Sequence, residues 1–321
     1  MSLLPVGESR AARTDASRLL EAARTAAIRL DYTGTLLQQQ GPALQTSRIT
    51  HIADARGGTE RVQLLEGPPR EYVRRGAELT WYLPDERRMV HDHLAGMHSF
   101  PALSFVSAQG LLVHYKAAEL GSDRVAGRTA SLLQLTPNDG LRYGYRFWFD
   151  TATGILLRAQ SISETGQVVA QTGFSQLAVG SNSGTRWRRP LYDTRGWKTE
   201  SALSGKADLS GWSFRLPDGF QQLVALRRVI VQQASGTGKR SGAIREVSQV
   251  ICSDGLAGIS LFIEPWSESR SLQPVQQGAI NMLGKRVGEF WLTIVGEVPM
   301  AALRQIADSL EFTDPQSNNS Q

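Results

Sequence analysis

Polar and apolar positions alternate with two different periods along this chain. Between residues 15 and 30, apolar side chains recur every three or four positions, which predicts an amphipathic helix with Asp15 as its N-cap. From Asp31 to about Ala178 the pattern changes to short segments of alternating polarity, separated by turns rich in glycine and proline. We expect strands at 31–39, 43–54, 59–66, 70–75, 78–83, 87–93, 112–119, 124–136, 141–150, 154–163 and 167–178. Consecutive strands without helices between them predict one large antiparallel sheet.

A second, smaller set of predicted strands follows residues 180–211, where polar and apolar positions no longer recur at a regular spacing. Residues 94–111 read as a long loop or a short helix, and residues 180–211 collect Gly, Ser, Thr, Arg and Trp without a pattern. We expect further strands at 212–216, 222–233, 243–252, 256–264, 277–287 and 289–296, and a closing helix at 299–310 that begins on a proline. The predicted organisation is a large domain at 12–180, a linker at 181–211, a small domain at 212–313 and a disordered tail at 314–321.

Composition narrows the class of protein only modestly. A chain of 321 residues with 41% hydrophobic and 20% charged residues is typical of a soluble globular protein with two domains. The net charge of +5 mildly favours acidic partners and does not indicate nucleic acid. Cys252 is the single cysteine, so no disulfide can form within the chain. No run of residues is long and apolar enough for a membrane span, and residues 1–12 lack the apolar core of a signal peptide.

Searches for catalytic and metal-binding motifs lead to no site. The stretch Gly236–Gly242 lacks the first glycine and the Ser or Thr of a phosphate loop, so we interpret it as a hairpin loop. His91, His93 and His98 cluster in sequence but have no Cys or Glu-x-x-His partner nearby, which favours surface histidines over a metal site. We expect Cys252 to be a buried thiol, because no histidine flanks it. The sequence therefore names no catalytic residue, no metal ligand and no cofactor.

The segment Leu141–Asp150 is the strongest positive feature. In an extended strand its alternate residues Tyr143, Tyr145, Phe147 and Phe149 point to one face, together with Leu141. One interpretation is a core strand whose aromatic rings pack beneath a helix. The other is the wall of an apolar cavity for a lipid chain, to which Trp81 and Tyr82 would also contribute.

The predicted linker holds a second candidate site. Arg186, Trp187, Arg188 and Arg189 interleave basic and aromatic side chains. Aromatic side chains can stack on the bases of single-stranded nucleic acid, and the basic side chains beside them can equally bind lipid phosphates or an acidic peptide. A solvated loop whose tryptophans fix it to a domain surface explains the same residues.

Several motifs resemble the RseB/MucB family of periplasmic stress regulators. The central block comprises Gly121, Arg124, Val125, Ala126, Gly127, Arg128, Leu135, Pro137, Asp139, Arg142, Tyr143, Gly144, Tyr145, Trp148, Asp150, Thr153 and Gly154. The flanking blocks are Tyr32–Thr35, Glu60–Arg61, Glu66–Gly67, Arg70–Glu71, Leu216–Pro217, Gly219–Phe220, Ser253–Ala257, Phe262–Pro265 and Val295–Pro299. These blocks occur in the family's order over residues 30 to 310.

This resemblance implies an α+β fold: a large antiparallel half-barrel wrapped over helices, as in the lipoprotein carriers LolA and LolB, and a smaller antiparallel α+β domain. It implies a location in the periplasm. It also implies a non-enzymatic negative regulator that binds the periplasmic segment of a membrane-bound anti-sigma factor, shields it from regulated proteolysis, and is released by lipid or lipopolysaccharide. The alternatives are a periplasmic lipid or lipoprotein carrier, and an enzyme whose polar site the sequence does not reveal.

Overall fold

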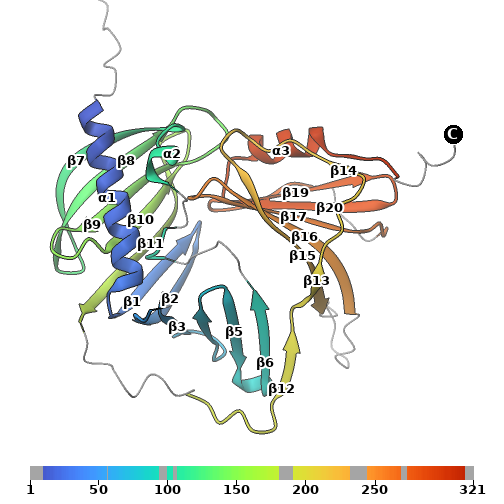
Figure 1. Cartoon of the computed structure of the whole chain (residues 1–321), viewed down its shortest axis with the longest axis horizontal. Coiled ribbons are helices and arrows are strands. Elements are labelled where there is room, and N and C mark those ends of the chain that lie inside the picture. The colour runs from blue at the N-terminus through green and yellow to red at the C-terminus, as the bar shows by residue number, and fades with distance from the viewer. Residues whose placement is uncertain are drawn as a thin grey trace, which may run out of the picture.

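Two largely antiparallel β-sheets, with helices packed on them, form most of the molecule (Figure 1). The computed structural model describes residues 10–55, 57–93, 100–103, 107–180, 191–231, 244–268 and 273–314. The fold class predicted from the sequence is confirmed, with few helices and a large sheet followed by a smaller one.

The large sheet has the strand order β12-β6-β5-β4-β3-β2-β1-β11-β10-β9-β8-β7. Its strands are β1 Tyr32–Gln40, β2 Ala43–Ile52, β3 Thr59–Leu64, β4 Glu71–Arg75, β5 Glu78–Leu83, β6 Arg88–His93, β7 Tyr115–Val125, β8 Arg128–Pro137, β9 Gly144–Asp150, β10 Leu156–Ile162, β11 Val168–Val179 and β12 Lys198–Ser201. β11, near the end of the large sheet in sequence, pairs with the first strand β1. The sheet curls into a half-barrel around helix α1, Arg10–Arg29 (Figure 1). A one-turn 3-10 helix, Pro84–Glu86, joins β5 to β6, and helix α2, Ala108–Leu111, precedes β7.

The small sheet has the order β13-β15-β16-β17-β20-β19-β18 and carries helix α3, Met300–Ser309. Its strands are β13 Leu203–Lys206, β15 Gln221–Val231, β16 Ile244–Ser253, β17 Gly258–Pro265, β18 Val275–Gln277, β19 Ile280–Val287 and β20 Phe290–Gly296, and a separate pair joins β14 Trp212–Ser213 to β21 Glu311–Phe312. The closing helix predicted at 299–310 is confirmed, with Pro299 at its N-cap. Cys252 is fully buried in this core, where burial raises the pKa of its thiol to about 12, as expected of a structural thiol.

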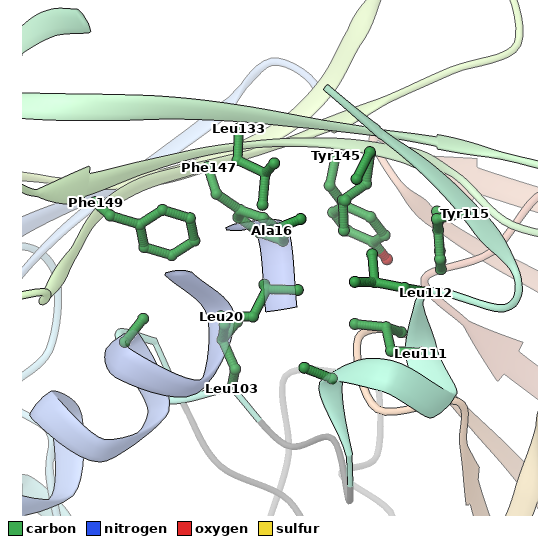
Figure 2. Packing of buried hydrophobic residues seen from close by; sticks show 14 of the residues in the cluster. Ala16, Leu20, Leu103, Leu111, Leu112, Tyr115, Leu133, Tyr145, Phe147 and Phe149 are labelled. Atoms are coloured by element: carbon green, nitrogen blue, oxygen red, sulfur yellow. The ribbon is translucent and has the colours of Figure 1, made fainter. Parts of the chain in front are cut away.

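The aromatic residues of β9 build the core beneath the helices. Tyr145, Phe147 and Phe149 face Leu20 of α1 (Figure 2), and each of these four side chains is almost completely buried. The rings form a continuous row, with 5.5 Å between the centroids of Tyr145 and Phe147 and 5.9 Å between those of Phe147 and Phe149. These aromatic side chains therefore form a core beneath a helix, which is the first of the two interpretations of this strand.

Two predictions about local structure are wrong. Asp15 does not cap α1, because it lies within the helix, which includes Arg10. Its Oδ1 lies 3.5 Å from Nη2 of Arg18. The strand boundaries predicted a turn between residues 119 and 124. Instead, β7 continues through a bulge to Val125, and the turn to β8 lies at Ala126 and Gly127, which both have positive φ.

The predicted linker also contains regular structure. β12 joins the edge strand β6 in parallel, and β13 joins β15. Their strand conformation depends on hydrogen bonds to existing sheet edges rather than on an apolar pattern of their own, so no pattern in the sequence predicted them. The domain boundaries themselves stay a prediction, and residues 315–321 of the predicted tail lie outside the described residues.

The buried carboxylate of Asp150 stabilises the end of the β9 strand. Arg128 donates a hydrogen bond of 2.9 Å to Asp150 Oδ2, and the Thr153 hydroxyl donates to the same oxygen. Burial alone would raise the pKa of Asp150, but these donors outweigh it and lower the pKa below its ordinary value.

Replacing Asp150 with asparagine should lower the free energy of unfolding by about 1–3 kcal/mol at neutral pH, because a charge-assisted pair is lost. The folded-state pKa lies below that of the unfolded chain, so this stabilisation is complete above about pH 4 and is lost as the pH falls through the lowered value. Urea unfolding of both proteins over this pH range tests the prediction. An Asp150→Asn difference that stayed constant down to pH 2 would contradict it.

Candidate functional site

An open cavity of about 490 Å³ lies between the large sheet and the small sheet. On the large-sheet side its apolar wall consists of Phe100, Ala102, Leu103, Tyr145, Phe147, Leu156 and Ala159. On the small-sheet side it consists of Ile251, Leu256, Ile259, Ile280 and Val295. Polar residues of the large sheet, among them Gln38, Ser161 and Thr172, and polar residues of the small-sheet side, including Glu297, complete the lining. Because both sheets contribute, the shape of this cavity depends on how they are held together.

A buried arginine joins the two sheets on one side of the cavity. Arg142, in the loop before β9, is fully buried, and its Nε donates to Asp139 at 3.1 Å. Its Nη1 donates to Asp254 in the turn between β16 and β17 at 3.3 Å, and its Nη2 donates to the backbone carbonyl of Asp218 at 2.5 Å. The guanidinium group also lies over the ring of Phe220, 5.5 Å from its centroid. Arg142 thus satisfies acceptors from both halves of the molecule.

Tyr115 adds a second hydrogen bond between the large-sheet half and Asp254. Its hydroxyl donates a hydrogen bond of 3.3 Å to Asp254 Oδ2, the oxygen that Arg142 also contacts. Burial, followed by the nearby Tyr145 and Asp254, raises the pKa of Tyr115 well above its ordinary value, so the phenol stays protonated and acts as a donor. Asp254 therefore receives two hydrogen bonds from the large-sheet half.

A second contact borders the cavity at the turn between β1 and β2. The amide of Gln40 donates to Glu297 Oε1 at 3.2 Å, and its oxygen accepts from the backbone N–H of Ala279 at 3.2 Å. Gly41 packs against Gly278, where φ is +59° and any side chain would overlap the backbone of Gly41. Two turns from different sheets can approach this closely only because both carry glycine.

Further contacts connect the two sheets through Asn281 of β19 and Arg228 of β15. The amide of Asn281 donates to the hydroxyl of Tyr143 at 3.0 Å and to the carbonyl of Val298 at 2.8 Å. Away from the cavity lining, Arg228 of β15 forms an ion pair of 2.7 Å with Asp92 of β6. The two sheets are thus held together by contacts at several points.

The aromatic residues predicted to line one cavity separate into three groups. Tyr145 and Phe147 border the cavity and also belong to the core packed against α1. Phe149 lies entirely in the core under α1, and Tyr143 precedes the strand and contacts Asn281 instead. The predicted alternation fails before Gly144 because β9 begins only there.

The prediction that Trp81 and Tyr82 contribute to this cavity is wrong. Both lie on β5, which is separated from β9 by several strands of the large sheet. Being neighbours in a strand they face opposite sides: Trp81 packs on Tyr72 with 5.0 Å between centroids, and Tyr82 faces Tyr192 at 6.3 Å. The adjacent strands fix these positions through their register, which sequence alone did not reveal.

The basic and aromatic group Arg186, Trp187, Arg188 and Arg189 lies outside the described residues, as do Gly236–Gly242 and His98. His91 lies on β6 with its Nδ1 3.0 Å from the hydroxyl of Thr80. Among the described residues no group of three or more potential ligands could hold a metal ion. No helix in the described part of the chain is long and apolar enough to cross a membrane.

Sequence reasoning missed the residues that join the two sheets. Arg142, Asp254 and Glu297 all stand in the blocks that resemble the RseB/MucB family, but the sequence did not indicate that they meet across the molecule. Gln40 gave no signal at all, because it is the last of three consecutive glutamines in a polar segment.

These features define a class of two-sheet β proteins in which a curled sheet and a smaller sheet share an apolar cavity. The chain belongs to the MucB/RseB family. Residues 15–192 match the MucB/RseB N-terminal domain, and residues 206–311 match the MucB/RseB C-terminal domain.

Named relatives resemble the chain over nearly its whole length. The sigma factor AlgU regulatory protein MucB of Pseudomonas aeruginosa is 30% identical, over 96% of this chain and 94% of that protein. The sigma-E factor regulatory protein RseB of Escherichia coli is 22% identical, over 92% of this chain and 90% of that protein. The solved complex of Pseudomonas aeruginosa MucA and MucB is similar with 25% identity and a TM-score of 0.68, covering 93% of this chain and 99% of that chain. A crystal structure of MucB in complex with MucA(peri), at 24% identity and a TM-score of 0.69, has the same fold.

Proposed function

We propose that this protein is a periplasmic negative regulator that binds the periplasmic segment of a membrane-bound anti-sigma factor. Binding shields the segment from the proteases that would otherwise cleave it and release the sigma factor. The observation that carries this proposal is the cavity between the two sheets, since a segment that enters it contacts both parts matched by the family models. The relatives named as sigma-factor regulators, and the solved MucA and MucB complex, support the same function.

Binding to such a cavity is physically reasonable for a peptide. Its wall is apolar on both sides, and burying apolar side chains contributes roughly 1.5–3 kcal/mol for each fully buried residue before entropic costs. No catalytic role is needed, and neither sequence nor site supplies a named catalytic group. The alternative, a periplasmic lipid or lipoprotein carrier, would use the large sheet alone, whereas the small sheet forms half of this cavity.

Lipid or lipopolysaccharide would act as the releasing signal by linkage. If lipid binds the free protein more tightly than the complex, it must weaken partner binding by the same factor. A hundredfold change requires about 2.7 kcal/mol of differential affinity.

Calorimetric titration of the full chain with the periplasmic segment of the anti-sigma factor from the same genome tests the proposal. We expect saturable binding that protects the segment from limited proteolysis, and a lower affinity in the same titration when lipopolysaccharide is present. Absence of binding, together with retention of lipid through purification, would favour the carrier.

A further inference from the structure

Glu297 is the one charged residue among the described residues that line the cavity. It follows β20 directly, and its backbone N–H donates to the carbonyl of Gly258 at 3.1 Å, which fixes its position at the edge of the small sheet. The remaining lining is apolar or neutral, so a single carboxylate determines the charge of the site.

This carboxylate has no counter-ion within the described part of the chain. One oxygen accepts the hydrogen bond from Gln40 at 3.2 Å, and no ion pair involves either oxygen. Solvent reaches Glu297 through the open side of the cavity, but the surrounding protein removes part of its hydration. This desolvation raises the pKa of Glu297 above its ordinary value, against the smaller opposite effect of the Gln40 hydrogen bond.

Such a carboxylate is stabilised by a cation that enters the cavity. Glu297 is exposed at the rim of the cavity, so a cation can reach it, and a positive group beside it would form a charge-assisted hydrogen bond. Gln40, held by its second hydrogen bond to Ala279, orients the carboxylate and leaves the other oxygen available. A lysine or arginine side chain can donate a charge-assisted hydrogen bond to that oxygen while its apolar neighbours contact Ile280 and Val295.

We propose that Glu297 determines which peptide segment the cavity takes, by pairing with a lysine or arginine that adjoins apolar side chains of the partner. This inference rests on the proposed function and deepens it. It also implies that an anionic lipid head group is disfavoured at this end of the cavity, because it would lie beside a like charge.

A double-mutant cycle tests the pairing. Glu297→Gln removes the charge and keeps the size, and Glu289→Gln is the matched control, because Glu289 is exposed and lies outside the cavity. Each basic residue of the anti-sigma segment is replaced singly by glutamine, and dissociation constants are measured by titration calorimetry for every combination.

We expect Glu297→Gln to weaken binding about tenfold, equivalent to about 1.4 kcal/mol, and Glu289→Gln to change it less than twofold. One basic substitution in the segment should weaken binding to the wild-type protein by a similar factor and have no effect on Glu297→Gln. Equal effects of Glu297→Gln and Glu289→Gln, or additive effects with every basic substitution, would overturn the inference while leaving the proposed function intact.

If the wild-type protein did not bind the segment, the proposed function would fail, and short amphiphiles would then decide the role of Glu297. Decylammonium and decanoate have the same chain and opposite charge. Tighter binding of decylammonium that disappears in Glu297→Gln supports a cation-selective cavity. Equal affinities, a preference for decanoate, or no binding of either compound overturns it.

Discussion

Replacing Arg142 with methionine should lower the free energy of unfolding by about 3–5 kcal/mol, the largest effect we expect from any single substitution in this protein. Methionine keeps much of the apolar stem but removes the positive charge. Asp254, which is buried with Arg142, then remains as a carboxylate without its ion-pair partner, and the carbonyl of Asp218 loses a donor. Urea denaturation followed by circular dichroism measures the loss.

Arg146 provides the matched control for Arg142. It stands four residues further along the same segment and donates to Gln134 at 3.0 Å, but it is not fully buried and contacts no acidic group of the small sheet. Arg146→Met should therefore cost less than about 1 kcal/mol. The double variant Arg142→Met with Asp254→Asn should recover part of the loss, since no unpaired charge remains. Similar unfolding midpoints for both single variants would show that Arg142 does not hold the sheets together.

Replacing Ser161 with tryptophan should weaken binding of the anti-sigma segment at least about thirtyfold, equivalent to about 2 kcal/mol. Ser161 lies on β10 with its side chain at the cavity wall, opposite the residues of the small sheet. An indole ring at this position occupies the space between the sheets that a partner side chain would need. Titration calorimetry with the same segment measures the change.

Ala178→Trp is the control for the added aromatic ring. Ala178 is exposed on β11, lies outside the cavity and pairs with Thr33 of β1. This variant should bind the segment as the wild-type protein does. Ser161→Trp and Ala178→Trp should both unfold at nearly the same denaturant concentration as the wild-type protein. A loss of binding can then be attributed to the filled cavity and not to unfolding. Undiminished binding by a folded Ser161→Trp protein would place the partner elsewhere on the molecule.

Local patterns in the sequence were sufficient to predict most of the secondary structure. The alternation of polar and apolar residues predicted nearly all strands of both sheets, and the closing helix was placed within one residue at each end. These predictions succeeded because a strand or helix with one buried side carries a period of its own. They failed where the period was absent, as in β12 and β13, which depend on the edges of other strands.

The candidate site was predictable only in part. Tyr145 and Phe147 were found because their strand is unusually rich in aromatic residues. Trp81 and Tyr82 were expected at the same cavity, but the strand order of the large sheet places them elsewhere. The Arg142 contact was not foreseen, because its partners are 76 and 112 positions away in the chain.

The sequence by itself determined most of the elements, the order of the two sheets and the family, because hydrophobic periodicity and motif order are properties of the linear chain. Only the tertiary structure decided which residues border the cavity and which connect the sheets. Gln40 and Glu297 are separated by 257 positions, and nothing in either segment indicates the other. Their contact follows from the curl of the large sheet and from two glycine turns that allow the backbones to approach, which are properties of the folded chain.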